Sequence, residues 1–232
     1  MSTYDGLIPS IDKRLETWSN LQSKVNKKNL VEKKYSVTLA RQFGCEGYPL
    51  AEELKKRLEK ETEEEWTVFD KALIEQVSKD KNLSENFLET LGDDAQVMEI
   101  LSIFKSRQKT QSEAFEILSE YIVKLAKSGN AILVGRGSTI LTEDLDNCFH
   151  FRLVAPFEFR VESISRRLDL SYDDAKKMVS EEQVRRDKFI EKHLSCNIND
   201  PLHYHAIFNN ERNGLPQIAA SIYTIMSTYL DT

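Results

Sequence analysis

The chain is predicted to be an α/β protein with a five-stranded, mainly parallel sheet flanked by helices on both faces. Three observations predict this. Short apolar runs alternate with helical stretches of ten or more residues along most of the chain. Two of the runs, 131–134 and 148–155, are apolar enough to be strands buried on both faces. Hydrophobic residues make up 40% of the 232, enough for one core. Such alternation favours right-handed βαβ units.

The N-terminal part of the chain predicts an appendage followed by the start of the sheet. Residues 1–34 are polar and lysine-rich, and their apolar side chains fall at helical spacing: Ile11, Leu15, Trp18, Leu21 and Val25. We expect an amphipathic helix packed on the body of the protein or on a partner, with the first option favoured. The main domain is expected over 35–232. It begins with a strand at 35–40, a helix carrying Leu50 to Leu58, a strand at 66–69 and a polar helical region at 71–110.

The C-terminal part continues the same alternation. A strongly apolar stripe from Ala114 to Ala126 predicts a helix, and Gly129 ends it. The elements expected after it are strands at 131–134 and 148–155, helices at 157–168 and 171–193, a strand at 204–208 and a closing helix at 215–230. Five strands result, and the sequence shows no internal repeat that would suggest a different architecture.

Composition and charge exclude some classes of function. The formal net charge is -6, so unspecific binding of nucleic acid is not expected. The three cysteines, Cys45, Cys148 and Cys196, form no CxxC pattern, which predicts a reducing compartment and neither a zinc site nor a disulfide framework. No apolar run approaches the roughly 20 residues that span a membrane, so we expect a cytoplasmic protein with no membrane partner. The sequence does not fix the oligomeric state, and a homodimer is one option.

A ligand site is expected where the strands end, because ligands of open parallel sheets bind at the carboxyl ends of the strands. The segments that follow the strands are rich in glycine, arginine and polar residues: 41–48, 70, 135–137, 156–160 and 209–210. The first of them places Gly44 and Gly47 between a strand and a helix, where backbone N–H groups can converge on an anion. The sequence therefore predicts a phosphate-binding site at this loop. The chain has no GxGxxG after a strand and no GxxxxGK[ST], so neither a dinucleotide fold nor a complete Walker A loop is predicted.

Five segments in the same order resemble the cytidylate kinase-like family. They cover about 35–230 and consist of the loop from Ala40 to Ala51, the strand and turn from Gly129 to Gly137, the stretch from Phe151 to Arg160, the helix segment from Val184 to Ile190, and the strand from Tyr204 to Asn209. The resemblance implies a three-layer, P-loop NTPase-like fold with a helical lid, at about 157–195. It also implies an activity: transfer of the γ-phosphoryl group of ATP, with Mg²⁺, to a CMP-like nucleoside monophosphate. Such catalysis consists of positioning and charge neutralisation.

The resemblance also implies roles for individual residues. Arg136 would grip the acceptor phosphate, and Arg160 and Arg186 would close on the donor phosphates, because arginine forks hold phosphate oxygens bidentately. Asp70 would face the acceptor nucleoside, and Arg41 would join Asp70 and Arg136 in contacting substrate. The ATP-binding loop would be formed by Gly44, Cys45, Glu46, Gly47 and Tyr48. For Arg160 and Arg186 the alternative is a solvated helix face, paired with nearby glutamates.

The loop departs from the family pattern, and this leaves a second hypothesis open. Tyr48 stands where the family has an arginine, Cys45 stands for a serine, and Glu46 for a small residue. A carboxylate about 4 Å from a phosphate repels it by roughly 4 kcal/mol at an effective dielectric near 20. Glu46 could also turn outward or ligate a metal. The alternative to an active kinase is therefore a degenerate member, a binding or regulatory module with weak or absent transfer activity.

Two further groups of residues were considered as sites. His203 and His205 are spaced as ligands on one face of a strand, but no third ligand lies beside them, so packing or surface placement is favoured and no metal site is predicted. Cys45 would lie at a helix N-terminus, which lowers the pKa of a thiol, whereas the neighbouring Glu46 opposes that shift. We expect an inert thiol.

Overall fold

The computed structural model describes residues 34–70 and 111–230 of the chain. The appendage predicted at 1–34 lies outside this part except for Lys34, and so does the helical region predicted at 71–110. The described strands are β1 (Ser36–Arg41), β2 (Thr67–Phe69), β3 (Ala131–Val134), β4 (Cys148–Val154) and β5 (Ala206–Asn209). The described helices are α2 (Gly47–Thr62), α6 (Gln111–Ser128), α7 (Ser138–Leu141), α8 (Phe157–Leu168), α9 (Tyr172–Leu194), α10 (Leu215–Leu230) and a 3-10 helix at Pro201–His203.

The five described strands form one sheet in which every pair is parallel. Their order is β2-β3-β1-β4-β5. Strand β1 therefore lies in the middle, with Leu39 opposite Val134 of β3 and Phe151 of β4. The chain leaves β1 toward one side of the sheet and later returns to the other side, which makes the carboxyl end of β1 a topological switch point. The expected five-stranded α/β fold is confirmed, and the sheet is wholly parallel.

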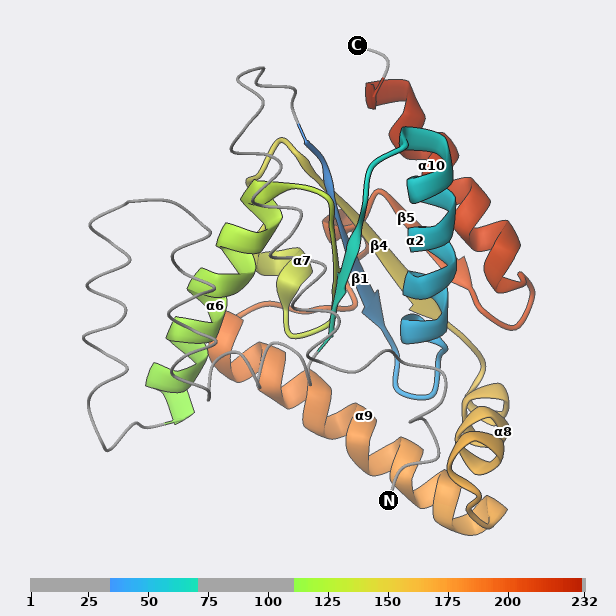
Figure 1. Ribbon diagram of the computed structural model, residues 1–232. Coiled ribbons are helices and arrows are strands. Elements are labelled where there is room, and N and C mark those ends of the chain that lie inside the picture. The colour runs from blue at the N-terminus through green and yellow to red at the C-terminus, as the bar shows by residue number, and fades with distance from the viewer. Residues whose placement is uncertain (1–33, 71–110, 231–232) are drawn as a thin grey trace.

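Helices cover both faces of the sheet, as Figure 1 shows, with α2 and α10 on one face and α6 and α7 on the other. Helix α2 forms because Leu50, Leu54 and Leu58 recur on one side of it, and all three are fully buried. They pack with Val37 and Leu39 of β1, while alternate strand residues face α6. The result is a three-layer arrangement with a core on each side of the sheet.

Helices α8 and α9 lie at the carboxyl edge of the sheet, and α9 crosses beneath the strand ends (Figure 1). Their limits follow from local chemistry. Pro156 precedes α8, and Asp169 ends it in the left-handed conformation. Ser171 caps α9, since its hydroxyl accepts a hydrogen bond from the Asp174 N–H at 3.2 Å. Helix α9 thereby covers the place where a ligand site is expected.

The predicted last strand is partly wrong. It was expected at 204–208, but β5 begins at Ala206, and the chain before it forms a short 3-10 helix that was not predicted. His203 ends that helix and His205 precedes the strand, so the two do not share a strand face as their spacing suggested. His203 Nδ1 lies 3.1 Å from a Glu143 carboxylate oxygen, and His205 Nδ1 accepts the His150 N–H at 3.0 Å. Among the described residues, no cluster of three potential metal ligands occurs.

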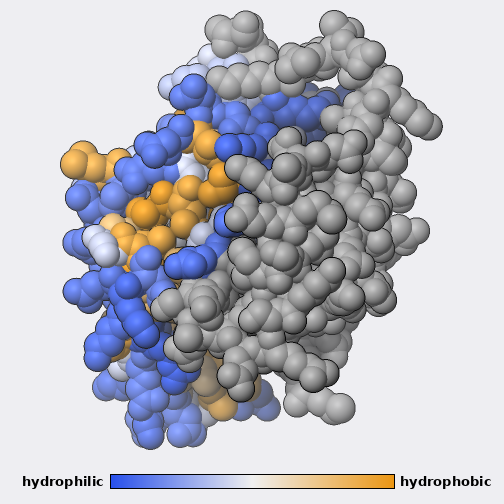
Figure 2. Space-filling view, turned by 90° about the vertical axis from the view of Figure 1, so that its left-hand side faces the viewer, coloured by the Kyte–Doolittle hydropathy of each residue, from blue (hydrophilic) through white to orange (hydrophobic). Residues whose placement is uncertain are grey.

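No helix in the described ranges is long and apolar enough to cross a membrane. Figure 2 shows the side of the molecule that is on the left in Figure 1, where hydrophilic residues cover most of the described surface and a hydrophobic strip interrupts them.

Candidate phosphate-binding site at the carboxyl edge of the sheet

Two neighbouring cavities open at the carboxyl ends of the strands. The first, here called the loop cavity, has a volume of about 470 Å³ and is bordered by the loop from Phe43 to Tyr48, by Asp70 and by Arg167. The second, here called the rear cavity, has a volume of about 200 Å³ and lies under α9, beside the turn after β3. Arg41 and Arg186 line both cavities, so these two guanidinium groups stand between them.

The loop after β1 is the one expected to bind phosphate, but most of its N–H donors are already engaged within the protein. Gly44 has φ of 96°, and a Cβ there would lie 2.6 Å from Arg160 Cβ, so only glycine fits. Four backbone N–H groups of the loop donate within the protein: Phe43 to Gln183 Oε1 at 2.8 Å, Cys45 to Gln42 O at 3.3 Å, Glu46 to Asn210 Oδ1 at 2.8 Å, and Gly47 to Cys45 O at 3.0 Å. The loop as it stands is therefore not an open nest of donors for a triphosphate.

Glu46 is turned away from the loop cavity. Its backbone, at φ -86° and ψ 52°, forms an inverse γ-turn closed by the Gly47 N–H. Its carboxylate accepts a long hydrogen bond, 3.4 Å, from the Asn210 side-chain amide, and Glu46 is not among the residues that border the cavity. The structure thus has the outward orientation that the sequence left open. The repulsion of roughly 4 kcal/mol expected for a carboxylate about 4 Å from phosphate does not apply in this orientation.

The side chain of Arg41 passes between Gly47 and Gly135. Its Cδ would lie 3.0 Å from a Cβ at Gly47, and its Nη1 would collide with a Cβ at Gly135, which has φ of 80°. The pKa of Arg41 is lowered to about 9, mainly by burial and also by the nearby charges of Arg186 and Arg136, while the charge of Asp70 opposes the shift. A guanidinium group held among like charges is stabilised by any anion that enters.

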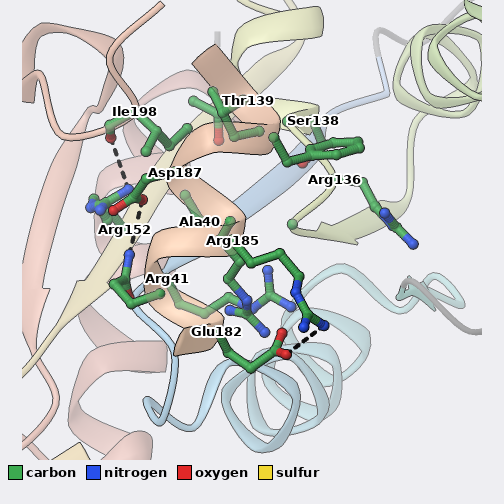
Figure 3. Close-up of a pocket in the computed structure, with 16 residues that line it drawn as sticks. Ala40, Arg41, Arg136, Ser138, Thr139, Arg152, Glu182, Arg185, Asp187 and Ile198 are labelled. Atoms are coloured by element: carbon green, nitrogen blue, oxygen red, sulfur yellow. Dashed lines mark hydrogen bonds and ion pairs between the residues drawn. The ribbon is translucent and has the colours of Figure 1, made fainter. Parts of the chain in front are cut away.

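Arg136 projects from a turn of three consecutive left-handed residues. Gly135, Arg136 and Gly137 have φ of 80°, 58° and 72°. The left-handed conformation costs a non-glycine residue roughly 1–2 kcal/mol, so the fold maintains Arg136 there at an energetic cost. The Arg136 guanidinium lies 5.6 Å from the ring centre of Phe189 on α9, and burial lowers its pKa. Figure 3 shows Arg136 extending from this turn beside the rear cavity.

Helix α9 brings Arg186 over the loop. The Arg186 guanidinium lies 4.8 Å from the ring centre of Phe43, and burial is the main cause that lowers its pKa. Its neighbour Arg185 behaves differently, since it is exposed and pairs with Glu182 at 2.7 Å (Figure 3). Arg185 therefore lies on a solvated helix face, whereas Arg186, for which such a face was the alternative, lines both cavities.

Arg160 has a structural environment and borders neither cavity. It is buried, and its side chain donates to two backbone carbonyl oxygens, Ala155 O at 3.2 Å and Phe43 O at 3.3 Å. Its Cβ also packs against Gly44. In this structure Arg160 supports the loop, and its contact with donor phosphates, which the resemblance implies, stays a prediction.

Cys45 and the carboxylates decide how well Mg²⁺ fits. Burial raises the pKa of the Cys45 thiol to about 11, so the thiol is protonated at neutral pH and is a poor ligand for a hard cation. Asp70 is the one carboxylate among the described residues that border the loop cavity. The arginines fit the phosphates of a nucleotide, but the loop has no hydroxyl or carboxylate set for Mg²⁺. We therefore derive no step through the metal.

Sequence reasoning missed several residues that shape the site. Gln183 and Asn210 hold the loop from positions 140 and 164 residues away, a separation at which no local pattern links them. The sequence predicts that Asn210 lies at the carboxyl edge of the sheet, but it does not predict the contact of Asn210 with the loop. Arg152 of β4 was also missed, although a charged residue inside a buried apolar run was a usable signal.

Comparisons with known proteins bear on the family and the fold of the chain. The model of the cytidylate kinase-like family matches residues 36–212. A crystal structure described as an uncharacterized protein from Eubacterium ventriosum ATCC 27560 is similar to the chain, with a TM-score of 0.64 and 13% sequence identity. The match covers 84% of this chain and 99% of that one, and at this identity it shows the fold alone. A search of curated proteins finds no match.

Proposed function

The chain belongs to the cytidylate kinase-like family, and we propose that it is a nucleotide phosphotransferase that moves the γ-phosphoryl group of ATP to a CMP-like nucleoside monophosphate. One observation carries the proposal: Arg41, Arg136 and Arg186 come from three different elements and meet at the switch point of the sheet. The pKa values of all three are lowered, mainly by burial, and an anion bound among them would offset that cost of burial.

The proposed division of roles follows from where these arginines lie. Arg136, on the turn after β3, would bind the acceptor phosphate, and Asp70, after β2, would contact the acceptor nucleoside. Arg186, on α9, would bind the donor phosphates above the loop, and Arg41 would lie between the two. In the transfer, an acceptor phosphate oxygen forms a bond to the γ-phosphorus while the bond to the β–γ bridging oxygen breaks, and ADP leaves with that oxygen. Positioned guanidinium groups lower the barrier by neutralising the charge on the transferred group.

The test is CMP-dependent formation of ADP from ATP, measured with and without Mg²⁺. We expect Arg136→Ala to reduce the rate by a hundredfold or more, in the range seen when one preorganised donor is removed. Arg166→Ala is the matched control, because Arg166 is an exposed arginine on α8 that borders neither cavity. Full activity of Arg136→Ala would remove Arg136 from the mechanism, and no ADP formation by the wild type with any nucleoside monophosphate would reject the phosphotransferase.

A second candidate is a nucleotide-binding module with little transfer activity. The engaged N–H groups of the loop favour it, because a triphosphate would have to displace the side chains of Gln183 and Asn210 to reach them. This candidate predicts weak ATP binding by the wild type and a gain in affinity for Glu46→Gly, because glycine relaxes the γ-turn that engages the Gly47 N–H. Micromolar ATP binding by the wild type, measured by calorimetry, would reject it in this form.

A further inference from the structure

We propose that Phe43, on the loop after β1, is a positioning residue for Arg186, and that its ring fixes the place where that guanidinium group meets the donor phosphates. The inference rests on the proposed function, in which Arg186 binds those phosphates. Both residues border the loop cavity, although Phe43 comes from the loop and Arg186 from α9. The Arg186 guanidinium lies 4.8 Å from the ring centre of Phe43, closer than in the other cation–ring contacts of the described residues, at 5.4 to 5.6 Å.

The ring of Phe43 is itself held in place by helices α8 and α9. It packs against four buried apolar residues of these helices: Val161, Ile164, Ala175 and Val179. The backbone of Phe43 contacts the same two helices, because its N–H donates to Gln183 Oε1 at 2.8 Å and its carbonyl oxygen accepts from Arg160 Nη1 at 3.3 Å. A side chain fixed in this way offers the cation one face at one place, which is what preorganisation of a binding group requires.

Arg186 is held by an aromatic face, while the two α9 carboxylates whose charges act on it are engaged elsewhere. Glu182 pairs with Arg185 at 2.7 Å, and Asp187 accepts from the Gln183 amide at 2.9 Å. An aromatic face attracts a cation without competing with phosphate for it, whereas a carboxylate in direct contact would compete. The five N–H donors of a guanidinium group lie in its own plane, so a ring that faces this plane leaves them available to phosphate oxygens.

Phe157 provides a matched comparison within the same cluster. Like Phe43, it is partly buried and packs against the apolar residues of α8 and α9, and an arginine, Arg160, lies 5.5 Å from its ring centre. Phe157 and Arg160 border neither the loop cavity nor the rear cavity. Arg160 is also held by two backbone carbonyl oxygens, so its position depends little on the ring. The two phenylalanines thus resemble each other in packing and differ in whether their arginine faces the site.

Calorimetric titration of ATP into the full chain tests the role of the ring. We expect Phe43→Leu, which keeps an apolar side chain in the cluster but removes the π face, to weaken ATP binding roughly two- to thirtyfold. Phe43→Tyr keeps the ring and should bind ATP as the wild type does. Phe157→Leu should lose a similar amount of stability in urea unfolding and keep the wild-type affinity. Wild-type affinity in Phe43→Leu, equal losses of affinity in Phe43→Leu and Phe157→Leu, or weakened binding in Phe43→Tyr would each overturn the proposal.

A double-mutant cycle distinguishes a role through Arg186 from a general effect on the loop. In an Arg186→Gln background, Phe43→Leu should cause little further loss of ATP affinity, because the group that the ring positions is gone. Fully additive losses would overturn the proposal, since Phe43 would then act on the loop and not through Arg186. ATP binding that follows the expected pattern without any CMP-dependent ADP formation would reject the proposed transfer and leave the role of Phe43 standing. ADP formation together with wild-type ATP affinity in Phe43→Leu would do the reverse, and no ATP binding by the wild type would reject both.

Discussion

Gly135→Ala tests whether the position of Arg41 is what makes the site. Alanine at φ of 80° costs roughly 1–2 kcal/mol, and its Cβ would collide with Arg41 Nη1, so the guanidinium has to move. We expect the free energy of unfolding to fall by about 2 kcal/mol. A charge-assisted hydrogen bond is worth about 1.5–3 kcal/mol, so a displaced Arg41 should weaken nucleotide binding roughly ten- to a hundredfold.

Two measurements on the same samples read out this substitution: urea unfolding for stability and calorimetric titration of ATP for affinity. Gly214→Ala is the control, because Gly214 lies just before α10 and a Cβ there meets the flexible end of the Gln217 side chain. It should change either quantity little. If Gly135→Ala binds ATP as the wild type does, Arg41 does not contact the phosphates and the reasoning is refuted.

Three further predictions concern protonation and the loop. ATP affinity should be constant up to about pH 9 and then fall by up to tenfold per pH unit, because the pKa of Arg41 is about 9 and only its protonated guanidinium binds phosphate. A pH series of ATP titrations, with Arg41→Gln as control, checks this. Burial, with His205 adding to it, lowers the pKa of His150 from 6.5 to about 4, so its contribution to stability is present above pH 6.5 and lost as the pH falls toward 4. Urea unfolding should therefore show about 2 kcal/mol less stability at pH 5 than at pH 7, and a smaller difference in His150→Gln. Gln183→Ala should accelerate hydrogen exchange of the Phe43 amide without unfolding the chain, because that amide loses its acceptor; unchanged exchange would show that the contact is not formed in solution.

Most of the fold could be predicted from the sequence because the signals are local. The stripe from Leu50 to Leu58 specifies a helix by its period alone, and the run at 131–134 specifies a strand by its apolar content and its flanking glycine. Helix α7 was missed because its four residues are too short for a periodic pattern. Residues Tyr204 and His205 have strand-like composition, but the 3-10 helix that precedes them sets the start of β5 two residues later.

The site was predicted only in part, because several of its contacts join residues that are far apart in the sequence. The switch point brings Arg41 and Arg136 together because their strands are neighbours, which a parallel sheet makes foreseeable. The outward orientation of Glu46 depends on Asn210, and the engagement of the Phe43 N–H depends on Gln183. Contacts between residues more than a hundred positions apart leave no pattern in a single sequence.

The central claim is that arginine side chains, with little help from the loop backbone, hold the nucleotide phosphates. Calorimetric titration of ATP into the wild type, Arg41→Gln, Arg186→Gln and the control Arg166→Gln tests it most directly. The account predicts an affinity loss of roughly ten- to a hundredfold for each of the first two variants and less than about threefold for the control. Equal affinity in all four proteins would contradict it.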